Sequence, residues 1–396
     1  MAKQSQARPR RLLNVLIFLL LAAGALWLTA KYWVGFNPTL GRATAPDRAL
    51  LKTRLELAEG IELSLYASGL RGARILLPLE SGQLLVSLTG EGRIVLLETD
   101  ADRDGEPDGR RTLVEGLNQP HGMDWFEGWL YIAETDAVGR IQLDPASGAT
   151  QGDYQRLVKN LPAGGGHSTR SLRFGPDGQM YVSVGSSCNV CIESDPRRAS
   201  LLRYRPDGSG EEIFASGLRN TVGFDWQPGT GHLYGVDNGR DMLGDDFPPC
   251  ELNQIEQGGF YGWPYWNGEN VLDPDFGDKS PDSIPASHPP AFSFGAHTAP
   301  LGIWFLRGEG VPEAYRGAAL VTLHGSWNRS TKSGYKVIAL YFEKDGRIRE
   351  QDFITGFEKD DEVIGRPVDV IQGPDGSIFI SDDFSGSIYR VVFQSP

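Results

Sequence analysis

The chain has 396 residues and is rich in glycine (50), proline (25) and aromatic side chains (9 Trp, 13 Tyr and 18 Phe). This composition excludes a disordered chain and is typical of a packed β protein with many turns. The formal net charge of −13 at pH 7 argues against nucleic acid as a partner, because a nucleic-acid-binding protein needs a basic face to neutralise phosphates.

The N-terminal residues predict a single membrane anchor. Residues 1–11 are a short basic segment, and the apolar run "LLNVLIFLLLAAGALWLTA" at residues 12–30 is long enough to cross a bilayer as a helix. Basic residues hold the preceding end in the cytoplasm, so we expect an inner-membrane protein whose remaining chain lies in the periplasm or outside the cell. A cleaved signal peptide is the alternative, although the run is long for one and no A-x-A site follows it. Residues 31–59 are expected to be a linker.

After residue 60, a turn glycine followed by a short alternating strand recurs six times. The units are "GQLLVS" (82–87), "GWLYIA" (128–133), "GQMYVS" (178–183), "GHLYGV" (231–236), "GAALVT" (317–322) and "GSIFIS" (376–381). Some begin with a Pro-Asp-Gly turn, in which proline presets φ and glycine accepts a positive φ. Repeats about 50 residues long are typical of propeller blades, so residues 60–396 predict an all-β, six-bladed β-propeller. The long interval at residues 231–317 predicts a loop insertion, and loops on a rigid scaffold commonly carry function.

The stretch "DADRDGEPD" at residues 100–108 begins like a calcium loop. Asp100, Asp102 and Asp104, followed by Gly105, have the spacing of the first calcium ligands. The twelfth position, where an EF-hand carries glutamate, is Arg111. Two interpretations stay open: a bound structural calcium, or an acidic hairpin loop in water.

Three cysteines fit an exported protein with one disulfide. The sequence "CNVC" at residues 188–191 lacks the following histidine of a c-type haem site, and zinc is not expected because no histidine lies nearby at metal spacing. Cys188 pairs with Cys191, or one of the two pairs with Cys250.

Polar residues flank the predicted hairpins of five blades, and we expect them to converge on the propeller axis. They are Gln119, His121, His167, Arg170, Arg219, Asn220, Asp237, Asn238, Arg240, His324, Trp327, Asn328, Arg329, Arg366 and Asp369. A single such residue is more often a turn or packing residue. Together, clustered Arg, His and Trp suit a planar, anionic, aromatic ligand, because arginine pairs with carboxylates and stacks on π-faces.

At this point the sequence resembles a known family. The motifs "GGHSTRSLRFGPDGQMYVSVGSSCNVC", "SGLRN", "DNGRD", "PPCELN", "GGFYGWPYWNG", "LHGSWNR" and "GRPVDV" are similar to those of the sugar dehydrogenases that use pyrroloquinoline quinone (PQQ), of the soluble glucose and L-sorbosone dehydrogenase types. The resemblance covers roughly residues 60–394.

The resemblance implies a catalytic histidine that takes the proton from the sugar's C1 hydroxyl while hydride passes to PQQ. His167 matches this base, and a neutral imidazole suits the role. Arg219 matches the arginine beside the reducible PQQ carbonyl, where negative charge develops. Asn220 matches a further PQQ contact.

The other roles follow from the same resemblance. Arg366 matches a partner of a PQQ carboxylate, and Lys332 fits the equivalent lysine better than Lys336. Trp327 and Arg329 are expected to contact the cofactor, and the backbone carbonyls of Gly239 and Arg240 to bind the calcium that bridges to PQQ. Expected substrate contacts are Gln119, His121 and Arg170.

Two positions depart from the family pattern. Ser186 stands where soluble glucose dehydrogenase has an aspartate that orients the histidine, and a serine cannot stabilise an imidazolium by charge. Cys250 replaces an acid before "EL", and nearby Asp245 and Asp246 could supply the lost charge. The departures bear on the preferred sugar more than on the cofactor.

The function expected from the sequence is oxidation of an aldose or aldehyde sugar with PQQ and calcium, with electrons passing to an external cytochrome or quinone. The alternatives are a calcium-dependent hydrolase of the lactonase type and a non-catalytic propeller that binds a sugar polymer or a protein. A lactonase needs an acidic metal cage at the axis, whereas this chain offers mainly Arg and His there.

Overall fold

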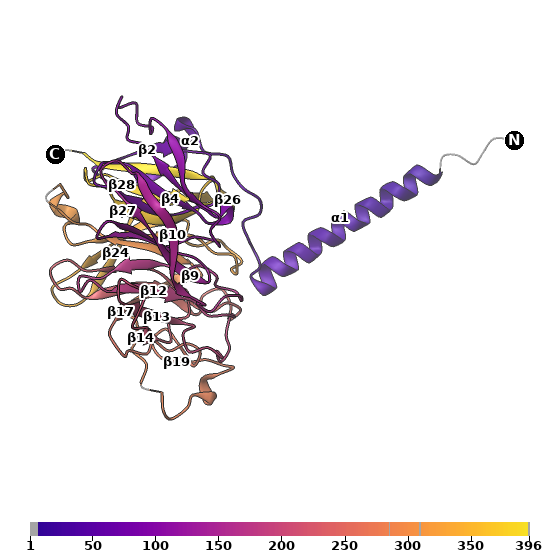
Figure 1. The fold of residues 1–396 in the computed structure, drawn as a ribbon. Coiled ribbons are helices and arrows are strands. Elements are labelled where there is room, and N and C mark those ends of the chain that lie inside the picture. Colours follow the sequence, from indigo (N-terminus) through magenta and orange to yellow (C-terminus); the bar gives the residue numbers. More distant parts are fainter. Residues whose placement is uncertain (1–6, 285, 309, 395–396) are drawn as a thin grey trace.

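The computed structural model describes residues 7–284, 286–308 and 310–394, and shows a long helix that projects from a β-propeller (Figure 1). Helix α1 (Ala7–Val34) contains the apolar stretch Val15–Tyr32, which is long enough to cross a membrane and contains no buried residue. Most of the predicted basic segment, residues 1–6, lies outside the described residues. The helix is compatible with a signal anchor or a single membrane span.

The propeller consists of six sheets, each a blade whose strands pair antiparallel. Blade one consists of β3 (Ala73–Pro78), β4 (Leu84–Leu88), β5 (Arg93–Leu97) and β6 (Arg110–Glu115). Blade two consists of β7 (Met123–Phe126), β8 (Trp129–Ala133), β9 (Ala137–Leu143) and β10 (Thr150–Lys159). Blade three consists of β11 (Leu172–Phe174), β12 (Met180–Val184), β13 (Ser200–Tyr204) and β14 (Glu212–Ser216). Blade four holds β15 (Thr221–Trp226), β16 (Leu233–Asp237), β17 (Pro249–Ile255) and β20 (Phe292–Ala296); blade five β21 (Pro300–Phe305), β22 (Ala319–Leu323), β23 (Lys336–Phe342) and β24 (Ile348–Thr355); blade six β27 (Pro367–Gln372), β28 (Ile378–Asp382) and β29 (Ser387–Phe393).

The six predicted repeats form the second strand of each blade, which confirms the six-bladed fold. The glycines that open the repeats have φ between +71° and +88°, so each turn uses a backbone conformation that other residues rarely adopt. Every residue of β4, β12, β16, β22 and β28 is buried. Burial on both faces follows because each sheet is packed between two neighbouring sheets.

The hydrophobic core is divided among the blade interfaces. Six of the core clusters each join side chains of two neighbouring blades, and the last one joins blade six to blade one, as where Phe379 packs with Leu76 and Val86. Side chains from the first strands of all six blades line one small central cavity. The ring is therefore complete, with the first strands innermost.

The N-terminal region after α1 is integrated into the propeller. Strand β2 (Ile61–Ala67) pairs with β29 and completes blade six, and β1 (Glu56–Leu57) pairs with the outer strand β24 of blade five. Between α1 and β1 lies the short helix α2 (Arg48–Arg54), whose Leu50 amide donates to the Asp47 side chain over 2.8 Å. The expected linker, residues 31–59, thus contains a helix and a strand.

The remaining elements are small and lie in loops. They are the hairpins β18 (Trp266–Asn267) with β19 (Val271–Leu272) and β25 (Glu358–Lys359) with β26 (Glu362–Val363), and the single turns η1 (Thr89–Glu91), η2 (Gly277–Lys279) and η3 (Glu313–Tyr315). The insertion of blade four runs from residue 256 to residue 291 between β17 and β20 and contains β18, β19 and η2.

Antiparallel pairing puts two kinds of loop on one face of the ring. The chain reverses direction at every turn, so two loops of each blade lie at the same end. One is the connection that leads into the first strand, and the other is the loop between the second and third strands. We call this end the funnel face. The loops that carry His167, Arg219, Arg366 and Lys332 all belong to it.

Candidate active site

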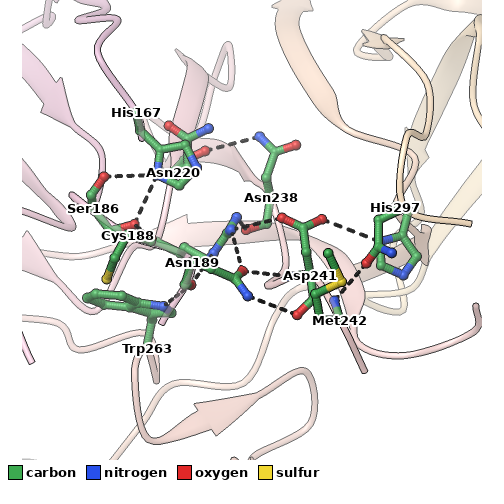
Figure 2. A network of polar contacts seen from close by, with 12 residues as sticks. His167, Ser186, Cys188, Asn189, Asn220, Asn238, Asp241, Met242, Trp263 and His297 are labelled. Atoms are coloured by element: carbon green, nitrogen blue, oxygen red, sulfur yellow. Dashed lines mark hydrogen bonds and ion pairs between the residues drawn. The ribbon is translucent and has the colours of Figure 1, made fainter. Parts of the chain in front are cut away.

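His167 lies in the loop between β10 and β11, on the funnel face, and its ring contacts Ser186 (Figure 2). Its Nδ1 atom is 3.0 Å from the Ser186 carbonyl oxygen and 2.9 Å from Ser186 Oγ. The hydroxyl of Ser186 donates its proton to the Cys188 carbonyl oxygen over 2.7 Å. Both groups that face Nδ1 are therefore acceptors, so Nδ1 carries the proton and Nε2 holds the free lone pair.

The electrostatic surroundings keep this imidazole neutral. Burial, followed by the positive charge of Arg219, lowers the pKa of His167 to about 4, and the hydrogen bond to the Ser186 carbonyl opposes the shift. Within the described part of the chain, no side chain or backbone group makes a hydrogen bond to His167 Nε2. At neutral pH the ring is thus an uncharged acceptor that a substrate hydroxyl can reach.

Gly185, directly before Ser186, brings His167 and Asn220 together. A Cβ atom at Gly185 would lie 2.6 Å from His167 Cβ and 2.6 Å from Asn220 Oδ1. The amide nitrogen of Asn220 is fixed in turn by Asp237 Oδ1 at 2.9 Å. Any side chain at Gly185 would displace one of these two predicted site residues.

Arg219 is almost completely buried behind this pair, and backbone and amide oxygens hold its guanidinium. Its Nε donates to the Asn189 carbonyl (2.9 Å), Nη1 to the Asn238 carbonyl (3.1 Å) and Nη2 to Asn189 Oδ1 (2.9 Å). Asp241 Oδ2 lies 3.3 Å from Nη2 and is the one carboxylate in contact with it among the described residues. The positive charge is therefore neutralised only in part and remains beside His167.

Asn189 is the hub of this network and lies inside the disulfide loop. Cys188 and Cys191 are bonded to each other, and Cys250 is a free, buried thiol. Besides Arg219, Asn189 holds Asp241 through two contacts: its Oδ1 accepts from the Asp241 amide (2.8 Å) and its Nδ2 donates to the Asp241 carbonyl (3.0 Å). The disulfide loop of blade three thereby holds the arginine and the neighbouring loop of blade four in one arrangement.

A second group of charges surrounds Asp383, in the loop between β28 and β29. Arg74 Nη1 (2.9 Å), Arg366 Nη2 (3.0 Å) and His324 Nε2 (3.0 Å) all contact this carboxylate. Burial alone would raise the pKa of Asp383, but His324, Arg74 and Arg366 lower it well below its usual range. Lys332 lies close enough for its charge to interact with Asp361, Glu358 and Arg366, so cations and carboxylates are interspersed on the blade five and blade six side of the funnel face.

The other predicted site residues occupy several different environments. Arg170 is fully buried and donates to the carbonyls of Pro162, His167 and Thr169, so it fixes the loop that carries His167. His121 is fully buried and its Nδ1 lies 3.4 Å from Ser171 Oγ.

Gln119 is exposed on the funnel face, where Thr135 contacts it at 3.4 Å. Trp327, Arg329 and Lys332 lie together in the β22–β23 loop.

The predicted calcium ligands Gly239 and Arg240 follow β16 on the funnel face. Among the described residues, neither of their carbonyl oxygens accepts a hydrogen bond, so both remain available to a hard cation. The Arg240 side chain is occupied by a buried ion pair with Asp273 of the blade four insertion, at 2.6 Å. The backbone, and not this side chain, is thus the possible ligand.

The acidic loop at residues 100–108 lies between β5 and β6, on the face opposite the funnel. The carboxylates of Asp100, Asp102 and Asp108 come together, with oxygen atoms within 4.8 Å of one another. Asp104 is not in this group, and its Oδ1 accepts from the Glu106 amide over 2.8 Å. Any calcium there would be remote from His167.

Three residues of the site were not assigned a role from the sequence: Asn189, Asp241 and Asp383. Asn189 stands between two cysteines, and Asp241 and Asp383 follow the "DNGR" and "SD" ends of second strands. The only available signal was their position after a predicted strand, because their partners come from other blades.

The fold and site together define a six-bladed β-propeller with a neutral imidazole, a buried arginine and asparagine amides on one face. The chain belongs to the glucose/sorbosone dehydrogenase family, whose sequence profile matches residues 131–390. An uncharacterized protein of Borreliella burgdorferi is 36% identical over 297 residues, which cover 72% of this chain and 78% of that protein.

Two solved structures share the fold. The holo form of the PQQ domain of pyranose dehydrogenase from Coprinopsis cinerea superposes with a TM-score of 0.71 at 20% identity, over 85% of this chain and 97% of that one. The calcium structure of a Trichoderma reesei carbohydrate-active enzyme of family AA12 has a TM-score of 0.71 at 21% identity, over 90% of this chain and 99% of that one. Family membership supports sugar dehydrogenase activity in general.

Proposed function

We propose that the protein is a membrane-anchored dehydrogenase that oxidises an aldose or a related aldehyde sugar with PQQ and calcium. The single observation that carries this proposal is the tautomer of His167, whose free Nε2 lone pair lies beside Arg219 and Asn220 on the funnel face. A sugar hydroxyl that donates to Nε2 would lose its proton there as the C1 hydrogen leaves as hydride. The anchor would hold the propeller on the periplasmic side, where an external cytochrome or quinone removes the electrons.

The donor set fits the proposed cofactor. A flat polycarboxylate requires cations and amides on one surface, and the funnel face provides Arg366 and Lys332 on one side and Asn220 with Arg219 on the other. The free carbonyl oxygens of Gly239 and Arg240 fit calcium. When bound, PQQ supplies the carbonyl that accepts hydride, and calcium supplies Lewis-acid polarisation.

The chain's own residues then have distinct duties. His167 holds the proton at Nε2, and its depressed pKa ensures that it is deprotonated before the reaction. Arg219 supplies fixed positive charge where negative charge develops, and Asn189 keeps it from turning. The hydrolase alternative is not favoured, because the carboxylate group at Asp100, Asp102 and Asp108 lies on the opposite face.

The test uses the full-length protein in detergent, loaded with PQQ and calcium. We expect PQQ to bind at micromolar concentration and a dye to be reduced with at least one sugar of an aldose panel. His167→Ala should lower turnover by about 10²–10⁴-fold, the usual contribution of a general base, and leave PQQ affinity within about threefold. His232→Ala, at an exposed histidine on the opposite face, is the matched control.

Two results would contradict the proposal. One is the absence of PQQ binding at micromolar concentration in the presence of calcium. The other is an equal effect of the two histidine substitutions on turnover. A loss of PQQ binding in His167→Ala alone would reassign His167 to the cofactor site.

A further inference from the structure

The last turn of α1 and the segment that follows it, together residues 31–43, lie on the funnel face, and we call them the tether. It bonds closely to the β22–β23 loop of blade five. The Asn37 amide donates to the Trp327 carbonyl (2.9 Å), Asn328 Nδ2 donates to the Val34 carbonyl (3.2 Å) and Lys332 Nζ donates to the Asn37 carbonyl (2.7 Å). Lys332, a predicted cofactor contact, thus also holds the tether.

Further contacts fix the tether to the loops of blade six. Lys31 pairs with Asp361, and Asn37 Nδ2 donates to Asp361 Oδ1 over 3.0 Å. At the far end of the tether, the Ala43 amide donates to the Phe384 carbonyl over 3.2 Å. Asn37 is buried, with 4% of its surface exposed. The membrane helix is therefore joined to the funnel face without a flexible spacer.

The helix consequently leaves the propeller on its funnel side. Figure 1 shows α1 extending outward from the side where β26 lies. If α1 crosses a bilayer, that bilayer faces the funnel and not the opposite end of the blades.

Exposed apolar side chains gather on the same face. Ile192 (60% exposed), Met242 (51%) and Trp327 (41%) lie in the loops after the second strands of blades three, four and five, and the tether adds Phe36 and Leu40. We call these five residues the apolar rim. Among the described residues, the funnel-face loops of blades one, two and six contain no exposed large apolar side chain.

We propose that the apolar rim inserts into the surface of the bilayer that holds α1, so that the funnel opens toward the membrane. The inference rests on the membrane anchor of the proposed function. Aromatic and aliphatic side chains at a rim beside a membrane helix match the residue types that enter the membrane interface. Because the loop residues of the rim belong to blades three to five only, the propeller is tilted against the bilayer. The funnel-face loops of blades one, two and six then lie away from the lipid and leave an entrance through which a polar sugar reaches the funnel.

The contact is with neutral lipid and not with anionic headgroups. The exposed carboxylates Asp246 and Glu362 on this face are each paired with an arginine, and the whole chain carries a net charge of −13. An anionic surface would repel a chain of this net charge, whereas the apolar rim gains free energy by leaving water. The test therefore uses phosphatidylcholine.

The experiment places the full chain in phosphatidylcholine vesicles with a fraction of spin-labelled lipid. A fluorophore is attached to Met242→Cys or, separately, to Ile192→Cys, and the control is Thr230→Cys, in the β15–β16 turn on the opposite face. The native cysteines do not interfere, because two are joined in a disulfide and the third is buried. We expect quenching at each rim position to exceed that at Thr230 by at least threefold.

The two possible failures are distinguishable. Vesicle flotation first reports whether the chain is anchored at all, and a chain that does not float overturns both the anchor and the rim contact. A chain that floats but shows equal quenching at Met242, Ile192 and Thr230 overturns the rim contact alone. Two rim positions are labelled in separate variants, so the test can still be made if one of these variants fails to fold.

Discussion

Replacement of Ser186 by aspartate should convert His167 into a much stronger base. Ser186 Oγ lies 2.9 Å from His167 Nδ1, so an aspartate carboxylate would accept the same Nδ1 proton and add a negative charge. The serine now offers only uncharged acceptors, which is one reason why burial and Arg219 lower the pKa of His167 to about 4.

The size of the effect follows from the geometry. Two unit charges about 4 Å apart attract by roughly 4 kcal/mol at an effective dielectric constant of about 20, which corresponds to about three pKa units. The new carboxylate is itself buried and loses the donation that Ser186 makes to the Cys188 carbonyl, so part of this gain is offset. We expect the pKa of His167 to rise by about 1–3 units.

The measurement is an NMR titration of the histidine ring carbons, which needs no catalytic turnover. With six histidines in the chain, the His167 signal is assigned by its loss in His167→Ala. Ser186→Asn is the control, because it has the shape of aspartate without the charge and should leave the pKa near its original value. If Ser186→Asp and Ser186→Asn titrate alike, Nδ1 does not face residue 186 and the tautomer argument fails.

Three other predictions concern the scaffold of the site. Reduction of the Cys188–Cys191 disulfide opens a short loop, and the chain-entropy relation gives roughly 2 kcal/mol for the stability lost. The melting temperature should therefore fall by only a few degrees, whereas PQQ affinity should fall at least tenfold. An unchanged PQQ affinity would contradict the proposal that this loop holds Arg219 in place. Burial, and then a neighbouring carboxylate, raise the pKa of Glu251 to about 8, so the folded protein keeps a proton that the unfolded chain releases above about pH 4.5. The free energy of unfolding therefore falls as the pH rises from about 4.5 to about 8. Calorimetry should show that Glu251→Gln unfolds at a higher temperature than the wild type at pH 8 but not at pH 4.5. Gly185→Ala puts a Cβ atom 2.6 Å from His167 Cβ and should lower turnover at least tenfold with a small change in melting temperature; full activity would show that the loop can move aside.

The turn chemistry made the propeller predictable. Positive φ angles at six spaced glycines are a local property of the chain, so the second strand of each blade could be identified without knowledge of its neighbours. His167, Arg219 and Asn220 were singled out because they flank these hairpins, and their expected roles came from the resemblance to a known family, whose motifs are contiguous in the sequence.

The contacts between blades could not be predicted from local pattern. Asn189 meets Arg219 and Asp241 only after three separate loops have reached the funnel face. Asp383 likewise collects its partners from other blades, among them Arg74, 309 residues away in sequence. No sequence pattern predicted the contacts of the tether with the funnel face, because residues 31–43 directly follow the apolar run and were expected to be part of a linker.

The pairing of β2 with β29 sets the order in which the protein can mature. Ile61 lies opposite Phe393, so β2, near the start of the propeller, must wait for β29, the last described strand. Such non-local pairing is slow, because loop closure precedes any gain from the contact. A chain with this topology keeps one blade edge open until β29 has been made, and a loss of the seven residues of β29 (Ser387–Phe393) would remove the partner of β2 and leave a permanent edge for aggregation.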